Sequence, residues 1–115
     1  MINKVFLMGP VKNSPQTKTT DKGLLFGNFT VEARDNTEKA AQWIRVQGFG
    51  KVAESIQGLK ENDVVIVEGK IESRKYTDPK SKEDKRLTYV SANKVVKFGS
   101  QVQDNNVSQD EELGF

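Results

Sequence analysis

Apolar and polar residues alternate along five segments of the chain, with the period of two that is typical of β-strands with one buried face. This alternation predicts strands at residues 3–8, 24–33, 42–49, 63–76 and 86–98. After the third segment the period changes, because Val52, Ile56 and Leu59 fall on one face of a short helix that ends near Gly58. Residues 10–23 are mostly polar and predict a loop, with room for a short strand near residues 16–20.

Three strands, one short helix and two strands form the element order of the OB fold. We therefore expect residues 1–98 to form an all-β domain, a five-stranded OB-fold barrel with its helix between strands three and four. The same order also fits a small open antiparallel sheet. Gly27 interrupts the second strand and predicts a bulge or bend at a barrel corner. Residues 99–115 are dominated by polar side chains and predict a disordered tail.

The composition limits the chemistry that the chain can perform. With no Cys and no His, it offers no disulfide, no Cys/His zinc site and no Ser-His-Asp triad. Gly50-Lys51 and Gly69-Lys70 are not followed by the Ser or Thr of a phosphate-binding P-loop. We therefore expect no enzymatic activity, no cofactor, no metal site and no small-molecule substrate.

The apolar segments of the sequence are all short. No stretch approaches the roughly 18 apolar residues that a membrane helix requires, and the longest aliphatic run is Val64 to Val67. The apolar stretch near the N-terminus is too short for the core of a signal peptide. We expect no membrane partner and a cytoplasmic location.

The net charge of +2 is divided unevenly along the chain. Residues 1–103 hold all 18 basic residues and 12 of the 16 acidic ones, which gives this part a charge of +6. Residues 104–115 hold the other four acids and no base. A basic body with a separate acidic end indicates a polyanionic ligand and a second electrostatic element.

The third and fourth predicted strands place aromatic and basic side chains on one outward face. With a period of two, Ile44 and Val46 point inward, whereas Trp43, Arg45, Gln47 and Phe49 point outward. In strand four, Val65, Val67, Gly69 and Ile71 form the inward row. Aromatic rings stack on bases and cations contact phosphates, so this face predicts binding to single-stranded nucleic acid. The residues expected to bind are Trp43, Arg45, Phe49, Lys70, Arg74, Lys75, Tyr76, Lys82, Lys85 and Arg86.

Each of these residues also has an ordinary structural interpretation. Trp43 would equally cover a barrel end or fill an interface, and Phe49 would pack beneath the helix. The lysines after Tyr76 alternate with acids and fit a solvated hairpin. The combination of aromatic and basic side chains favours binding over these interpretations.

The C-terminal tip combines acidic and apolar residues in a way that solubility alone does not require. Its residues are Asp110, Glu111, Glu112, Leu113, Gly114 and Phe115. Burial of one Phe side chain in a pocket contributes about 1.5–3 kcal/mol, and basic residues around the pocket would pair with the acids. The tip therefore predicts a short peptide that docks onto partner proteins.

Several segments together resemble the bacterial single-stranded DNA-binding protein family, in chromosomal, phage or plasmid form. The resemblance covers residues 2–98 and 110–115. It is carried by Asn3-Lys4-Val5-Phe6-Leu7-Met8-Gly9, by Trp43-Ile44-Arg45-Val46 with Phe49-Gly50-Lys51-Val52-Ala53-Glu54, by Val65-Ile66-Val67-Glu68-Gly69-Lys70-Ile71, by Arg74-Lys75-Tyr76-Thr77-Asp78 and by the acidic tip.

This resemblance implies an OB fold, a homo-oligomer that is usually a tetramer, and bases stacked on Trp43, Phe49 and Tyr76. It also implies that the tip recruits replication, recombination and repair proteins. The chain departs from the family in three places: residues 34–41 lack a further stacking Trp, Gly114 replaces a Pro, and the linker of residues 99–109 is short.

Two other functions remain open from the sequence. One is a specialised OB-fold accessory protein that acts in a primosome or binds RNA. The other is a protein-interaction adaptor whose outward aromatic residues are buried in an oligomer and do not contact DNA.

Overall fold

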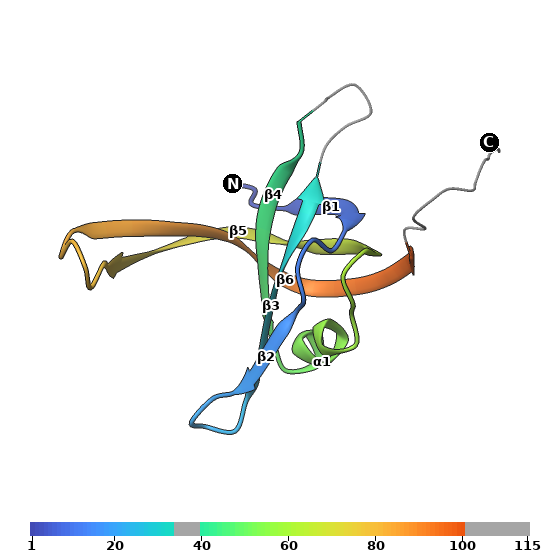
Figure 1. The fold of residues 1–115 in the computed structure, drawn as a ribbon, viewed down its shortest axis with the longest axis horizontal. Coiled ribbons are helices and arrows are strands. Elements are labelled where there is room, and N and C mark those ends of the chain that lie inside the picture. Colours follow the sequence, from blue (N-terminus) through green and yellow to red (C-terminus); the bar gives the residue numbers. More distant parts are fainter. Residues whose placement is uncertain (34–39, 101–115) are drawn as a thin grey trace.

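The computed structural model describes residues 1–33 and 40–100. The elements in order are β1 (Val5–Pro10), β2 (Gln16–Thr19), β3 (Leu25–Ala33), β4 (Gln42–Phe49), α1 (Lys51–Gln57), β5 (Asp63–Thr77) and β6 (Asp84–Ser100) (Figure 1). All five expected strands and the helix are present, and the short strand near residues 16–20 is formed as β2. The first strand extends through Gly9 and Pro10, beyond its expected end. The expected disordered tail lies outside the described residues, apart from its first two positions, which end β6.

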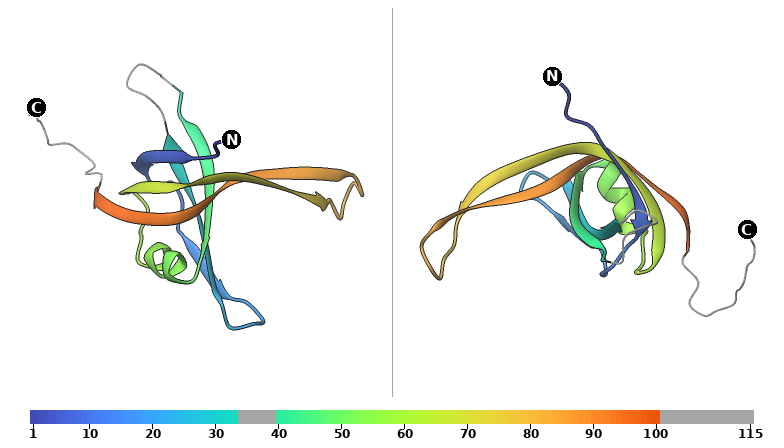
Figure 2. Two further views of the ribbon diagram at one scale, coloured as in Figure 1. Left: turned by 180° about the vertical axis from the view of Figure 1, so that it is seen from behind. Right: turned by 90° about the horizontal axis from the view of Figure 1, so that it is seen from above.

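The six strands form one sheet in the order β1-β5-β6-β4-β3-β2. Because β1 and β2 follow one another in the chain but occupy opposite edges, the sheet curls until its two edges approach (Figure 2, right). The contact is made by the segment after β1 and by β3: an isolated bridge joins Val11 to Val31, and the Lys12 amide donates to the Thr30 carbonyl at 2.9 Å. No continuous strand pair closes the curl within the described residues. The expected OB fold is confirmed as a partly open barrel. The sheet has six strands where five were expected, because β2 forms in the segment predicted to be mostly loop.

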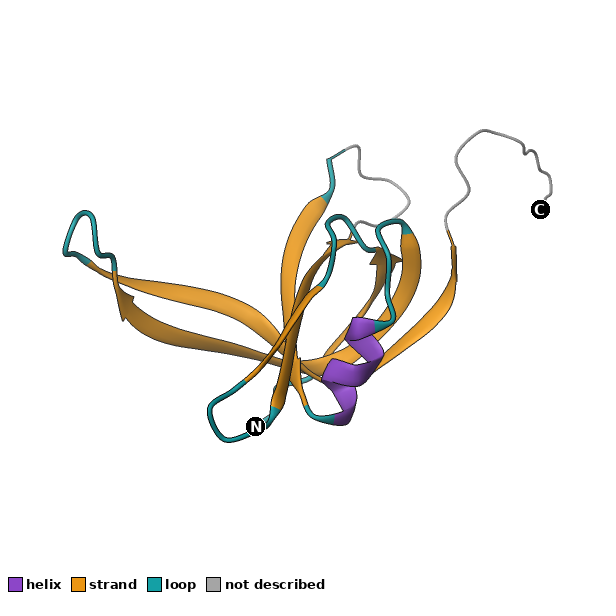
Figure 3. Cartoon of the chain, turned by 60° about the horizontal axis from the view of Figure 1, so that its bottom comes forward, coloured by secondary structure: helices purple, strands orange, loops and turns teal. Residues whose placement is uncertain are grey.

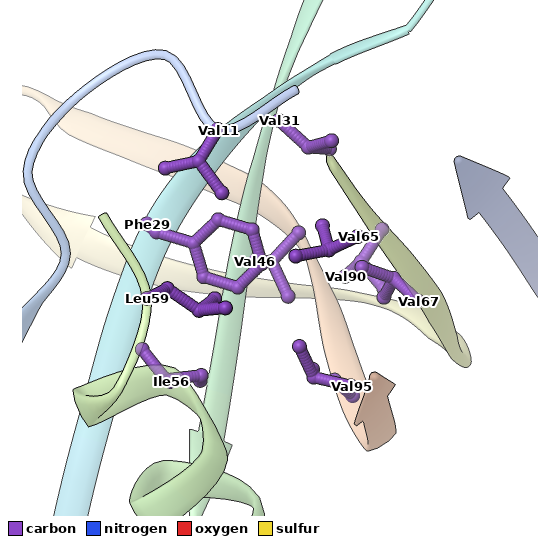
Figure 4. Close-up of a cluster of buried hydrophobic side chains, with 11 residues drawn as sticks. Val11, Phe29, Val31, Val46, Ile56, Leu59, Val65, Val67, Val90 and Val95 are labelled. Carbon is purple, nitrogen blue, oxygen red and sulfur yellow. The ribbon is translucent and has the colours of Figure 1, made fainter. Parts of the chain in front are cut away.

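The interior of the curl is filled with aliphatic side chains around one aromatic ring. Phe29 of β3 is only 1% exposed and lies between Val11, Val46 and Leu59 (Figure 4). The inward row predicted for β5 is confirmed at Val65 and Val67, which are fully buried. Burial of such side chains contributes about 1.5–3 kcal/mol each, so this core stabilises the curled sheet.

Helix α1 packs against β3, β4 and β6 at one end of the barrel (Figure 3). The helical face predicted from Val52, Ile56 and Leu59 is confirmed, since Ile56 is fully buried and Leu59 is 7% exposed. Two strand glycines make this contact close. A Cβ at Gly27 would lie 3.1 Å from Cγ2 of Ile56, and a Cβ at Gly48 would overlap Val52.

The expected bulge at Gly27 is absent, because β3 pairs in unbroken register with both β2 and β4. Gly27 instead provides space for α1. The bulges lie between β5 and β6, where the register shifts at Val64/Val65 and at Glu68/Gly69. Beyond the second bulge, residues 70–91 form a two-stranded arm that extends away from the barrel (Figures 1 and 2).

Ile71 is the one member of the predicted inward row of β5 that is not buried. It pairs with the buried Val90 but is 52% exposed. The reason is its position at the base of the arm, where the barrel ends. Asn3 fixes this position, since its side chain donates to the Ile71 carbonyl at 2.8 Å and accepts from the Ile71 amide at 2.9 Å. No helix among the described residues is long and apolar enough to cross a membrane.

Candidate nucleic-acid interface

The outer row of β4 presents two exposed aromatic rings and one exposed cation. Trp43 is 63% exposed and Phe49 is 50% exposed, and Arg45 between them is also exposed. Phe49 therefore does not pack beneath α1, which lies on the inner side of β4. The structure places all three predicted residues on one side of the same strand, as the alternation required.

Gln47 belongs to the same row but is buried, with only 5% exposure, contrary to the expectation that it faces solvent. The pairing explains this difference. Gln47 is flanked by Asn28 of β3 and by Ser91 of β6, because β4 pairs with β6 only at Val46 and Gln47. The β4–β6 ladder does not reach Trp43 and Phe49, which therefore have a strand partner on one side only.

The arm divides the other predicted residues between its two faces. Register places Ser91 of β6 beside both Gln47 and Lys70, so the outer face of β4 continues onto the arm. Alternation then puts one set of side chains on this outer face. The set comprises Lys70, Glu72, Arg74 and Tyr76 of β5, and Lys85, Leu87, Tyr89 and Ser91 of β6.

Three predicted residues are not part of that set. Lys75 and Arg86 pair with one another across the ladder and alternate to the opposite face of the arm. The Arg86 guanidinium donates to the Ser73 hydroxyl there at 3.1 Å. Lys82 lies in the turn at the tip of the arm, with a left-handed backbone (φ 59°), and its amide donates to the Asp78 carbonyl at 2.7 Å.

Two open hollows connect the β4 row to the arm. The first is lined by apolar side chains of β1, β5 and β6 together with Trp43, Arg45 and Tyr89. The second is lined by Arg45, Arg74, Lys75, Tyr76 and Leu87. Arg45 lines both hollows, so the Trp43 end of β4 and the Tyr76 end of the arm belong to one continuous surface.

Ion pairs separate the predicted cations into two groups. Lys70 lies 3.4 Å from Glu72, Lys75 lies 3.6 Å from Asp84, and Lys85 lies 3.0 Å from Asp78. By contrast, no carboxylate of the described residues pairs with Arg45, Arg74 or Arg86. The Arg74 guanidinium lies 5.8 Å from the centre of the Tyr89 ring, a cation–π distance.

The structure adds residues to this surface that sequence reasoning missed. Tyr89 lies in the outer row, and its hydroxyl donates to the Glu72 carboxylate at 3.0 Å. Burial, with this hydrogen bond as a second cause, raises the pKa of Tyr89. Phe26 of β3 lies beside Phe49, with ring centres 5.0 Å apart. A period-two reading of the second and fifth predicted strands would have placed both rings on the outer face.

The predicted docking tip, residues 110–115, lies outside the described residues. Within the described ranges, no group of three or more Asp, Glu, His or Cys residues is arranged to hold a metal ion.

Comparison with known proteins gives consistent matches over nearly all of the described chain. The model of the "Single-strand binding protein family" matches residues 2–98. A curated protein of Chlorobaculum tepidum, named "Single-stranded DNA-binding protein 1", is 30% identical over 97 residues, which cover 77% of this chain and 60% of the relative. Proteins named "Single-stranded DNA-binding protein" are 32% identical over 96 residues in Mycoplasma genitalium (82% of this chain, 59% of the relative) and 34% identical over 107 residues in Xanthomonas campestris pv. campestris (85% and 61%).

The chain spans about 60% of the length of these relatives. The family match covers β1 to β6 almost completely and includes the segments on which the sequence resemblance rests, except the acidic tip of residues 110–115. The chain belongs to the single-strand binding protein family.

Proposed function

We propose that this protein binds single-stranded DNA, without strong sequence preference, on the outer face shared by β4 and the arm. The observation that supports this proposal most strongly is the row in which Arg45 lies between the exposed rings of Trp43 and Phe49. A ring stacks on any base, at about 1–3 kcal/mol per base, so recognition by stacking tolerates every sequence. Arg45 pairs with no carboxylate in the described part of the chain, so we expect its guanidinium to contact phosphate, which is common to all nucleotides.

We propose that the DNA strand runs from Phe49 along β4 to Trp43. It then continues onto the arm through the hollow that Arg45 and Tyr76 line. The remaining predicted cations of this face, Lys70 and Lys85, would exchange an acidic partner for a phosphate. The proposed path does not include Lys75, Lys82 and Arg86, which stay predictions. Only a DNA strand that wraps around the arm or its tip would contact them.

The direct test is a competition assay that compares single-stranded DNA, duplex DNA and RNA of matched sequence. We expect single-stranded DNA to compete best, and Trp43→Leu to weaken its binding by about 1–3 kcal/mol. Trp43→Phe, which keeps a ring, serves as the matched control and retains most of the affinity. Preferred binding of RNA would favour an accessory RNA-binding role, and absence of binding would favour an adaptor.

We further propose that the protein acts as a homo-oligomer, with the tetramer as the expected form. An apolar patch of Phe6, Met8, Ile66 and Val96 lies on the outer side of β1, β5 and β6, away from β4. Phe6 is 65% exposed and Met8 is 52% exposed. Among the described residues, β1 pairs along one edge only, with β5, and exposed apolar patches and free edges mark interfaces. Met8→Glu is expected to lower the oligomeric state in sedimentation, and an unchanged state would exclude this patch as the interface.

The biological role proposed is protection of single-stranded DNA in the cytoplasm during replication, recombination and repair. The tip, residues 110–115, would recruit the partner proteins of these processes. Deletion of residues 110–115 is expected to abolish partner capture and to leave DNA affinity unchanged or higher. Capture of the same partners by the shortened chain would exclude this role.

A further inference from the structure

We propose that Phe26 and Lys18 form an additional nucleotide subsite, next to Phe49 and at the β2 edge of the sheet. This inference rests on the proposed binding of single-stranded DNA and extends it beyond the predicted residues. Its ligand is the nucleotide adjacent to the one that stacks on Phe49, with its base on the Phe26 ring and its phosphate near the Lys18 ammonium.

Register places the three side chains in one line across three strands. Phe49 of β4 pairs with Phe26 of β3, and Phe26 pairs with Lys18 of β2. Directly paired residues project from the same side of a sheet. Because Phe49 is on the outer face, Phe26 and Lys18 are on that face too, and the proposed surface continues to the β2 edge.

The two rings present separate faces to a ligand. Their centres are 5.0 Å apart and their planes are inclined by 51°. A single planar base cannot lie flat on two rings at that angle, so the pair suits two successive bases. Phe26 is only partly buried and Phe49 is half exposed, which leaves ring surface on each for a base.

Helix α1 prevents these rings from turning inward. On the inner side of the same strands, Gly27 and Gly48 allow Ile56 and Val52 to pack close to the backbone. The space beneath Phe26 and Phe49 is therefore filled. The backbone under both rings is supported by the helix, so the rings are held in place before a ligand arrives and little ordering is needed on binding.

The charge of this row is not compensated. Lys18 is exposed and pairs with no carboxylate of the described residues. The row of Lys18, Phe26 and Phe49 contains no acid, in contrast to the arm, where Glu72 lies beside Lys70 at 3.4 Å. A cation next to a stacking ring is the combination that single-stranded DNA requires.

The test measures binding of oligothymidines of graded length by the full chain and four variants, at several salt concentrations. Phe26→Leu is expected to lower affinity for long oligomers about 5- to 150-fold, the range for loss of one stacked base. Its affinity should also stop rising with length about one nucleotide earlier than that of the unchanged protein. Phe26→Tyr keeps the ring and should restore both properties.

Lys18→Gln tests the phosphate contact without any change to the ring pair. It should reduce the slope of log affinity against log salt by about 0.7, the value for one phosphate contact on a single strand. Lys60→Gln, an exposed lysine in the loop after α1, is the matched control and should leave the slope unchanged.

The outcomes separate this inference from the proposed function. If the unchanged protein shows no salt-dependent binding, the proposed function itself fails. If it binds but Phe26→Leu and Lys18→Gln both match it at every length and salt concentration, the strand does not reach β2 and the subsite is wrong. Should Phe26→Leu unfold, as a thermal melt would reveal, the salt slope of Lys18→Gln still decides the question, and an unchanged slope would exclude the subsite.

Discussion

Arg74 and Arg86 offer a sharp test of which side of the arm faces DNA. Both lie on the arm, and neither pairs with a carboxylate of the described residues. Arg74 belongs to the outer face, 5.8 Å from the ring of Tyr89, whereas Arg86 alternates to the opposite face and donates to Ser73 at 3.1 Å. Arg74→Gln removes one positive charge from the outer face of the arm, and Arg86→Gln removes the same charge from the opposite face.

The expected effect of Arg74→Gln follows from one lost phosphate contact. An exposed ion pair contributes up to about 1 kcal/mol, so affinity should fall by up to about fivefold. The salt slope should decrease by about 0.7. Between 50 and 200 mM salt, the variant would therefore lose about 2.5-fold less affinity than the unchanged protein.

The assay is fluorescence anisotropy of an end-labelled oligothymidine at four salt concentrations, with Arg86→Gln measured in parallel. We expect the slope of Arg86→Gln to match that of the unchanged protein. If Arg86→Gln reduced the slope as much as Arg74→Gln, DNA would contact both sides of the arm and the assignment of one binding face would be refuted. If neither variant changed the slope, the bound DNA would not follow the arm.

Three further predictions concern the scaffold. Gly48→Ala should destabilise the protein by about 1–3 kcal/mol, because the added methyl group overlaps Val52 against α1; Gly99→Ala, with open space around its Cβ, should be nearly neutral in the same denaturant melt. Asn3→Ala should accelerate hydrogen exchange of the Ile71 amide, which loses its acceptor. The pKa of the Asp78 carboxyl lies below its ordinary value of 3.8, chiefly because it accepts from the Lys80 amide; the NMR shift of the Asp78 side-chain carbon should therefore change as the pH falls through this lowered pKa, and a midpoint above 3.8 would contradict the hydrogen bond.

The alternation of apolar and polar residues was sufficient to predict the strands, the helix and their order. It was sufficient because β3, β4 and the barrel parts of β5 and β6 each have one buried face, so their period of two is a direct record of burial. The same logic located the outer row of β4. It did not show that β1 and β2 would occupy opposite edges, since sheet order depends on pairing between residues far apart in the chain.

Alternation along a single strand gave wrong predictions of burial where burial depends on residues far away in the sequence. Gln47 is covered because β6 pairs with β4 only at that point, and Ile71 is exposed because the barrel ends there. Gly27 predicts a bulge or bend, but its strand pairs in unbroken register and the glycine gives space to Ile56 from α1. None of these facts is encoded in the residues adjacent to each position.

The candidate surface was only partly predictable for a related reason. Arg74, Lys75 and Tyr76 form one basic and aromatic cluster in the sequence, although alternation along β5 puts Lys75 on the face opposite its two neighbours. Phe26 and Lys18 contribute to the row of Phe49 only through cross-strand pairing. Alternation in the second predicted strand would have placed Phe26 on the outer face. Its position beside Phe49 and Lys18 follows from the register, which is known only when the sheet is built.

The most direct test of the central claim uses Trp43, the only tryptophan of the chain and 63% exposed on the outer row of β4. Oligothymidine should be titrated into the protein at low and at high salt while tryptophan emission is recorded. We predict quenching of Trp43 that saturates with DNA, at an affinity that falls steeply as salt increases. Unchanged emission at concentrations where an independent binding assay shows the complex is formed would contradict stacking on this row.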